Sequence, residues 1–232
     1  MKNFFQNTLY ARDYRQKASE NCAKLSNNLA LVFLVYFLIS ILVSVIDQIT
    51  GTEKIIELGS YELITKNTWF SSLFNLFCAG AFSISLILIQ KKVYVGQNAE
   101  VNDLFEGFKD YARSFIINIL QSIFIALWTL LFIVPGIIKA LSYSMSYYIA
   151  IDNPQLSANE CITKSREMMN GNKWNYFCLV FSYIGWIILS VLTLGILFLW
   201  VAPKMQQANY LFYLKVSGKG AQLEQEELLV SE

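Results

Sequence analysis

The chain of 232 residues contains no histidine and only three prolines, and only 15% of its residues are charged. Histidine is the commonest general base and metal ligand, so its absence excludes serine–histidine triads and histidine-based zinc sites. The P-loop, HExxH and GxSxG motifs are also missing, and no pair of acids falls within an apolar run. We therefore expect no catalytic site and no cofactor.

The four cysteines stand apart from one another, and no CxxC spacing occurs. Cysteines in apolar runs behave as small hydrophobic residues, so we expect neither a disulfide nor a metal site. The formal net charge is +1, without the clustered basic excess that a nucleic-acid-binding protein shows. Nucleic acid is therefore not an expected partner.

Hydrophobic residues make up 55% of the chain, and they gather in runs of near-membrane length. A helix needs about 20 apolar residues to cross roughly 30 Å of hydrocarbon. A soluble domain usually has about a quarter of its residues charged, which is well above the fraction found here. The composition thus predicts an all-α, polytopic integral membrane protein.

The apolar runs predict six transmembrane helices arranged as three hairpins, with tight turns at Pro135-Gly136 and at Gly195. Cytoplasmic amphipathic helices are predicted before the hairpins, over 101–112 and 158–170. Ser157 and Glu160 are spaced as a capping box for the second of these helices, and Gly171 suits its C-terminal cap. We divide the chain into an amphipathic N-terminal segment at 1–28, a membrane domain at 29–214 and an acidic tail at 215–232. The six predicted spans are 29–46, 68–89, 115–134, 136–151, 174–192 and 196–214.

The distribution of basic residues predicts how this arrangement is oriented in the membrane. Fifteen lysines and arginines fall on the side that holds both termini, two fall on the other side, and Lys139 lies within the fourth span. Cytoplasmic loops of membrane proteins carry the excess of basic residues. We therefore expect a multi-pass protein of the bacterial plasma membrane with both termini in the cytoplasm.

The second half of the chain carries recognisable motifs. The stretch "LLFIVPGIIKALSYSMSYYIAIDNPQLSANECITKSREMMNGNKWNYF" is followed by "IGWIILSVLTLGILFLWVAP". It resembles the bacterial integral membrane family known as domain of unknown function 975. The "PGIIKALSYSM" hairpin, the "DNP" after it and the "LTLGI" turn carry the resemblance. The family implies this membrane topology but no activity.

A weak internal repeat accompanies these motifs. "FKDYARSFIINIL" before "VPGII" parallels "SREMMNGNKWNYFCLV" before "TLGIL", about 59 residues later. The pattern predicts a repeated helical hairpin, although a coincidence of hydropathy is the alternative. Repeats of this kind are common in transporters, and they also occur in membrane proteins that move nothing.

Lys139 is the first candidate functional residue. A lysine inside a membrane span costs a few kcal/mol at the bilayer centre, which marks it as a candidate site for an anionic substrate or lipid. The alternative is that its long stem reaches the headgroups from a position near the outer interface. Ser142, Tyr143 and Ser146 follow on the same helical face. They could line a polar path, but such residues more often pack helices together.

The cytoplasmic half of the sixth span is the second candidate. Pro203 removes a backbone hydrogen bond and predicts a kink. Lys204 and Gln207 would then line a cavity open to the cytoplasm. Alternatively, the span leaves the membrane near Lys204 and the remainder lies at the interface. Basic residues around 164–173 predict contact with anionic lipids of the inner leaflet, and the same face could bind a protein partner.

Two functional hypotheses follow. The first is a non-catalytic membrane factor that assists or protects a partner, for example in export, envelope stress or peptide immunity. The second is a small transporter or channel subunit with a polar path near Lys139 and Gln207. A water-filled cavity shared by these two residues would favour transport, and two residues facing lipid or headgroups would count against it. The oligomeric state is not predicted.

The orientation can be tested by scanning single cysteines for access to a membrane-impermeant thiol reagent in whole cells. Cysteines placed near Gly51 should react from outside. Those near Lys109 should react only after the membrane is opened. The reverse pattern would overturn the assignment of both termini to the cytoplasm.

Overall fold

The computed structural model describes residues 2–23, 26–51, 53–58, 61–66, 69–193 and 195–220, with side chains from 11–23, 28–51, 69–193 and 195–220. Most of the predicted acidic tail lies outside these residues, as do the side chains of residues 52–67 in the predicted loop between the first two spans. The division into three segments therefore stays a prediction.

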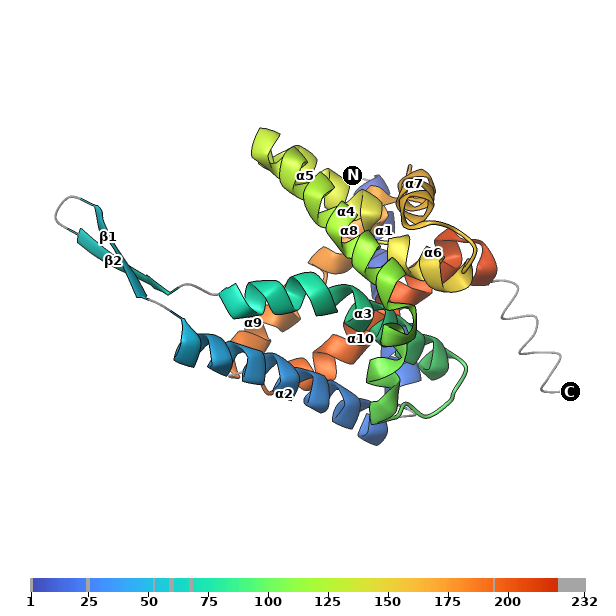
Figure 1. Ribbon diagram of the computed structural model, residues 1–232. Coiled ribbons are helices and arrows are strands. Elements are labelled where there is room, and N and C mark those ends of the chain that lie inside the picture. Colours follow the sequence, from blue (N-terminus) through green and yellow to red (C-terminus); the bar gives the residue numbers. More distant parts are fainter. Residues whose placement is uncertain are drawn as a thin grey trace, which may run out of the picture.

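The described chain is a bundle of helices with one β-hairpin (Figure 1). The elements in chain order are α1 (Lys2–Ala23), α2 (Ser26–Thr50), β1 (Glu53–Leu58), β2 (Tyr61–Lys66), α3 (Trp69–Tyr94), the 3-10 helix η1 (Val101–Asp110), α4 (Tyr111–Leu131), α5 (Ile133–Tyr143), α6 (Ser146–Asp152), α7 (Ala158–Met168), α8 (Lys173–Phe181), α9 (Ile184–Leu192) and α10 (Phe198–Val216).

Four described segments are long and apolar enough to cross a membrane. They are Asn28–Thr50, Trp69–Tyr94, Val101–Leu131 and Lys173–Leu192, and they contain most or all of the first, second, third and fifth predicted spans. The all-α membrane class is thus supported by the structure. The six-span topology and the cytoplasmic placement of the amphipathic helices stay predictions.

The fourth predicted span is divided in two. Helix α5 ends at Tyr143 and α6 begins at Ser146, and the 11 residues of α5 extend roughly 16 Å. Neither helix reaches across a bilayer alone. Helix α5 instead lies beside α4, and the two form a hairpin (Figure 1).

The reversal of that hairpin occurs earlier than the sequence pattern indicates. Helix α4 ends at Leu131, and Phe132 is the extended residue that turns the chain (φ −157°, ψ 142°). Pro135 and Gly136 lie in the first turn of α5, where proline loses no intrahelical hydrogen bond. A Cβ on Gly136 would overlap the Thr129 side chain of α4, so glycine permits the close approach of the two helices.

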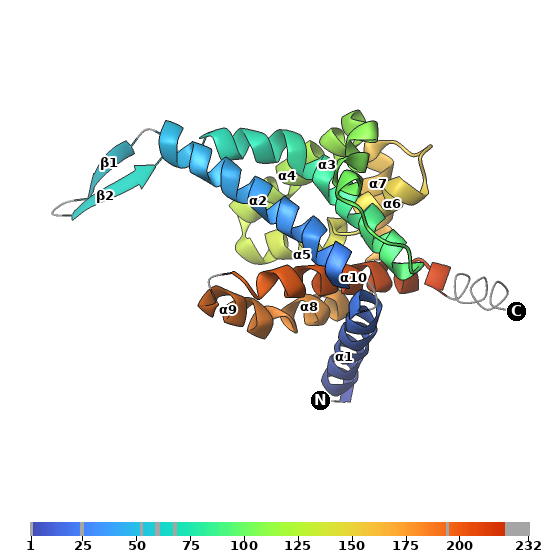
Figure 2. The same ribbon diagram turned by 90° about the horizontal axis from the view of Figure 1, so that it is seen from below.

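The sixth predicted span corresponds to α10, which is enclosed by other helices. It contacts α1, α2, α3 and α9, and Figure 2 shows it between the α2–α3 pair and the α8–α9 segment. Phe212 and Tyr213 are among the largest fully buried side chains. The helix continues through Pro203, so the predicted break does not interrupt it. Gly195, at φ +84°, forms the turn that precedes α10, and its N–H donates to Ser190 O at 2.8 Å.

A two-stranded antiparallel hairpin replaces the loop expected between the first two spans. Glu53 pairs with Lys66 at its base, and Leu58 pairs with Tyr61 near its tip. The hairpin extends past the ends of α2 and α3 (Figure 1). Asp47 closes its base, because its carboxylate accepts the Phe70 and Ser71 N–H groups, each at 3.0 Å.

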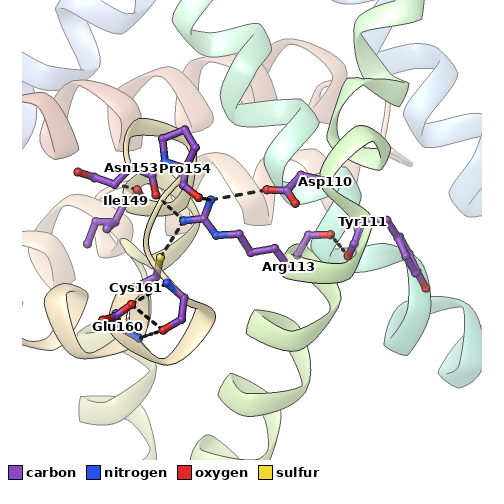
Figure 3. A network of polar contacts seen from close by, with 10 residues as sticks. Asp110, Tyr111, Arg113, Ile149, Asn153, Pro154, Glu160 and Cys161 are labelled. Atoms are coloured by element: carbon purple, nitrogen blue, oxygen red, sulfur yellow. Dashed lines mark hydrogen bonds and ion pairs between the residues drawn. The ribbon is translucent and has the colours of Figure 1, made fainter.

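One arginine fixes the turn between α6 and α7 (Figure 3). The Arg113 side chain is 11% exposed. Its Nη2 donates to Asn153 O at 2.6 Å and to Cys161 Sγ at 3.3 Å, and its Nη1 donates to Pro154 O at 3.2 Å. A planar guanidinium suits this set of acceptors because it offers several donors in a fixed geometry. Arg113 therefore joins the start of α4 to the "DNP" segment.

The start of α7 confirms a capping box at Ser157 and Glu160. Ser157 Oγ accepts from Glu160 N, and the Glu160 carboxylate accepts from Ser157 N at 2.7 Å. Bonds from Ser157 lower the pKa of the exposed Glu160 carboxyl group. Cys161 and Ser165 on the opposite face are buried. The capping box and Arg113 together set the position of α7.

Substitution Arg113→Lys should lower the unfolding temperature of the detergent-solubilised protein. Lysine carries a single charged nitrogen and cannot reach all the acceptors that Arg113 joins, and each unsatisfied buried group costs about 1–3 kcal/mol. The matched control is Arg166→Lys, at an exposed position on α7. An unchanged unfolding temperature in the first variant, or an equal drop in both, would contradict this role.

Candidate functional site

A basic cleft lies where α1 meets the break between α8 and α9 and the start of α10. Its volume is about 310 Å³. It combines cations with aromatic rings, and its main lining residues are Arg12, Arg15, Tyr183, Trp186, Trp200 and Lys204. We call this site the basic cleft.

Helix α1 supplies two of the three cations through its helical spacing. Arg12 and Arg15 lie on one face, which continues through Gln16 and Ser19. The other face holds Ala11, Ala18 and Cys22, which are buried. Small residues allow α1 to approach α10 closely, and the Tyr14 and Phe212 rings lie 6.1 Å apart at that contact. The same packing turns the arginines toward the cleft.

Arg15 joins α1 to the α8–α9 break. Its Nη1 donates to Ser182 O at 3.0 Å, while its Nε is buried without a hydrogen-bond partner among the described residues. A guanidinium has five N–H donors, so most of them stay available to an anion. The break between α8 and α9 thus exposes a carbonyl that orients the arginine.

Lys204 enters the cleft from α10. Its backbone carbonyl accepts from the Tyr183 hydroxyl at 3.3 Å, which ties α10 to α9. Its charge also acts on α1. Burial raises the pKa of the Cys22 thiol to about 12, and the positive charge of Lys204 reduces this rise. Among the described residues, no carboxylate forms an ion pair with Arg12, Arg15 or Lys204. The three charges therefore add in one place.

Two tryptophans complete the cleft. Trp186 is 47% exposed and Trp200 is 51% exposed. Exposed tryptophans are enriched at the membrane–water interface, where their rings lie at the level of the headgroups. Cations beside such rings fit a phosphate carried by a lipid, because charged donors bind phosphate oxygens strongly.

Lys139 lies elsewhere in the structure. Its Nζ is 4.5 Å from the centroid of the Trp128 ring, across the α4–α5 hairpin. A cation over a tryptophan face is attracted by about 0.5–1 kcal/mol at an exposed site. This contact accounts for the position of the ammonium group without a substrate.

The predicted polar stripe on α5 and α6 is used in packing. Ser142, Tyr143 and Ser146 are buried. The carbonyl of Ser142 accepts from Ser165 Oγ of α7 at 2.8 Å, and that of Tyr143 accepts from Gln121 Nε2 of α4 at 3.0 Å. Among the contacts described, these two backbone carbonyls join helices, while the Ser142 and Ser146 hydroxyls donate to nearby carbonyls, those of Ile138 and Tyr143.

Gln207 is buried in the core beside α3. It is fully buried, and neither of its amide atoms has a partner among the described residues. Gln90 on α3 is in the same condition. Neither Lys139 nor Gln207 lines the basic cleft, and the path between them stays a prediction.

Sequence reasoning singled out Lys204 but not its companions. Arg12 and Arg15 entered only as part of the general basic charge of the N-terminal segment. Their spacing of three residues, with Gln16 and Ser19 on the same face, was the available signal. Nothing in the sequence indicated that this face would meet Trp186 and Trp200.

The comparisons with known proteins agree with the resemblance seen in the sequence. Residues 130–220 match the family described as "Protein of unknown function (DUF975)". The match includes the α9 and α10 walls of the basic cleft but not the α1 wall. The curated proteins and the solved structures contain no match to the chain.

Proposed function

We propose that this protein, whose residues 130–220 match the DUF975 family, is a non-catalytic membrane factor that binds an anionic lipid and assists or protects a partner. The observation that carries the proposal is the basic cleft. Arg12, Arg15 and Lys204 converge there without a described carboxylate between them, beside two half-exposed tryptophans.

The affinity of the basic cleft for an anionic lipid can be estimated from its number of cations. Each cation near an anionic membrane surface contributes about 1 kcal/mol. Three cations acting together contribute about 3 kcal/mol, which corresponds to roughly a hundredfold in affinity. A cleft strengthens this attraction relative to a flat surface, because its walls displace water from around the charges.

The positive-inside pattern supports a cytoplasmic position for the cleft. Arg12 and Arg15 belong to the N-terminal segment, which is predicted to be cytoplasmic, and Lys204 meets them in the cleft. Anionic lipids of a bacterial plasma membrane would then reach the cleft from the inner leaflet.

The non-catalytic role is supported by the other charged side chains, which form ion pairs with one another between helices. Lys92 Nζ bonds Asp103 Oδ1 at 2.6 Å, and Lys219 Nζ bonds Asp152 Oδ2 at 2.8 Å. Asp152 also accepts from the Tyr213 hydroxyl at 2.8 Å. These pairs join helices and do not line the basic cleft. Assistance in export, envelope stress or peptide immunity is the role that we propose for such a scaffold.

A small transporter or channel subunit is the second candidate. The observation that favours it is the pair of unpartnered buried amides, Gln90 and Gln207, since buried polar groups without partners are rare and need an explanation. It ranks second because Lys139, the other end of the expected path, lies over Trp128.

The lipid site can be tested with the double variant Arg12→Gln and Lys204→Gln, which leaves the Arg15 hydrogen bond to Ser182 in place. Native mass spectrometry of the detergent-solubilised protein should show binding of phosphatidylglycerol weakened by about 10- to 100-fold, the share expected for two of the three cations. Binding of phosphatidylcholine should stay the same.

The control is the double variant Lys91→Gln and Lys109→Gln, which removes two cations from exposed positions outside the basic cleft. It should keep most of its phosphatidylglycerol binding. Equal losses in the two double variants would show that the total charge matters and the cleft does not.

A further inference from the structure

The three cations of the basic cleft enter it in a row along helix α1. Lys204 lies at the end marked by Cys22, because its charge acts on that thiol. Arg12 precedes Cys22 by ten residues, which is about 15 Å along a helix. Arg15 lies between these two ends, one helical turn after Arg12. The cleft therefore offers its charges over a length and not around one point.

Helix α10 gives the same order. The Tyr14 ring, two residues after Arg12, packs against Phe212 with the ring centroids 6.1 Å apart. Phe212 follows Lys204 by eight residues, which is about 12 Å along α10. The distances along α1 and along α10 agree, so Arg12 and Lys204 enter the cleft from opposite ends.

Arg15 can serve an anion on either side of it. Its Nη1 donates to Ser182 O at 3.0 Å, and its buried Nε has no partner among the described residues. A guanidinium has five N–H donors in a fixed fork, which suits phosphate oxygens. A phosphodiester carries one negative charge, so a single one leaves two of the three cations uncompensated.

The opposite wall of the cleft is apolar. It is formed by Trp186 of α9 and by Leu197, Trp200 and Val201 at the start of α10. The volume of about 310 Å³ equals the share of about ten water molecules, which is more than one phosphate group occupies. A wall of cations facing a wall of rings and aliphatic groups suits an elongated headgroup that is still attached to its acyl chains.

We propose that the basic cleft selects a lipid with two phosphates joined by a short bridge, as in cardiolipin, over lipids with one phosphate. One phosphate binds near Arg12 and the other near Lys204, with Arg15 between them. This inference rests on the proposed function, because it takes the same cleft and names the class of lipid. Basic pockets between helices on the cytoplasmic side are typical sites for cardiolipin headgroups.

The selectivity has a physical source in the bridge between the two phosphates. Once one phosphate is bound, the bridge holds the second close to the other end of the cleft. Binding of the second phosphate is then intramolecular, and it gains from a high effective concentration. Two separate lipids with one phosphate each lack this gain, even when they bring the same total charge.

The probes are tetraoleoyl cardiolipin and dioleoyl phosphatidylglycerol, the second at twice the molar concentration so that phosphates and acyl chains are matched. Native mass spectrometry of the full chain in a neutral detergent should show at least tenfold tighter binding of cardiolipin. Equal binding per phosphate would overturn the inference.

Two single variants test the two ends. Arg12→Gln and Lys204→Gln should each remove most of the preference for cardiolipin, because each leaves only one end able to hold a phosphate. Phosphatidylglycerol should lose at most about fivefold in either variant, the share of one cation, since its phosphate can bind at the other end. An equal loss for both lipids, or a preserved preference in both variants, would overturn the inference.

Arg12 is exposed, so its variant decides the question even where Lys204→Gln fails to fold. The matched control is Lys109→Gln, which removes one exposed cation outside the cleft. It should keep the full preference for cardiolipin. Loss of the preference in this control would show that the total charge sets it and the row of cations does not.

The headgroup alone separates a lipid from a soluble ligand. Glycerol bisphosphate, which has two phosphates and no acyl chains, should fail to displace cardiolipin at equal concentration. Displacement would assign the cleft to a soluble bisphosphate and overturn the lipid assignment.

Failure of this inference differs from failure of the proposed function. Equal affinities for the two lipids, both lost in the double variant Arg12→Gln and Lys204→Gln, would leave an anionic-lipid site without selectivity. Unchanged binding of both lipids in that double variant would contradict the proposed function itself.

Discussion

Helix α10 carries more polar side chains than lipid tolerates, and it is stable within this fold because other helices surround it. Lys204 and Gln207 lie on a helix whose buried residues include Phe212 and Tyr213. In hydrocarbon each charged or unpaired polar group costs several kcal/mol. The packing of α1, α2, α3 and α9 around α10 keeps most of these groups away from hydrocarbon. The basic cleft, the α1 packing and the burial of Gln207 all depend on this enclosure.

The enclosure also explains why hydropathy alone could not separate two kinds of apolar helix. Segments 28–50 and 69–94 are apolar because they are suited to lipid, whereas α10 is apolar because other helices cover it. Helix α5 keeps exposed apolar side chains but is too short to cross a bilayer alone. A run of hydrophobic residues has the same appearance in both cases. The four candidate spans were therefore predictable, while the status of the fourth and sixth was not.

Local signals predicted local structure well. The Ser157–Glu160 spacing predicted a capping box that the structure contains, and Gly171 follows α7 at φ +81° as a helix end requires. Pro135 led to a wrong position for the reversal between α4 and α5, because proline is compatible both with a turn and with the first turn of a helix. The role of Arg113 could not be predicted from the sequence, because its acceptors are backbone carbonyls about 40 residues away. Tertiary contacts of this kind leave no periodic pattern.

The bond between Asp47 and the start of α3 has a consequence for the segment outside the helices. It joins the two ends of a long excursion of the chain, so the β-hairpin begins from a closed base. The entropic cost of a longer excursion grows only with the logarithm of its length. The length of the β-hairpin can therefore vary widely, in evolution or when an epitope is inserted between β1 and β2. Helices α2 and α3 keep their positions in either case.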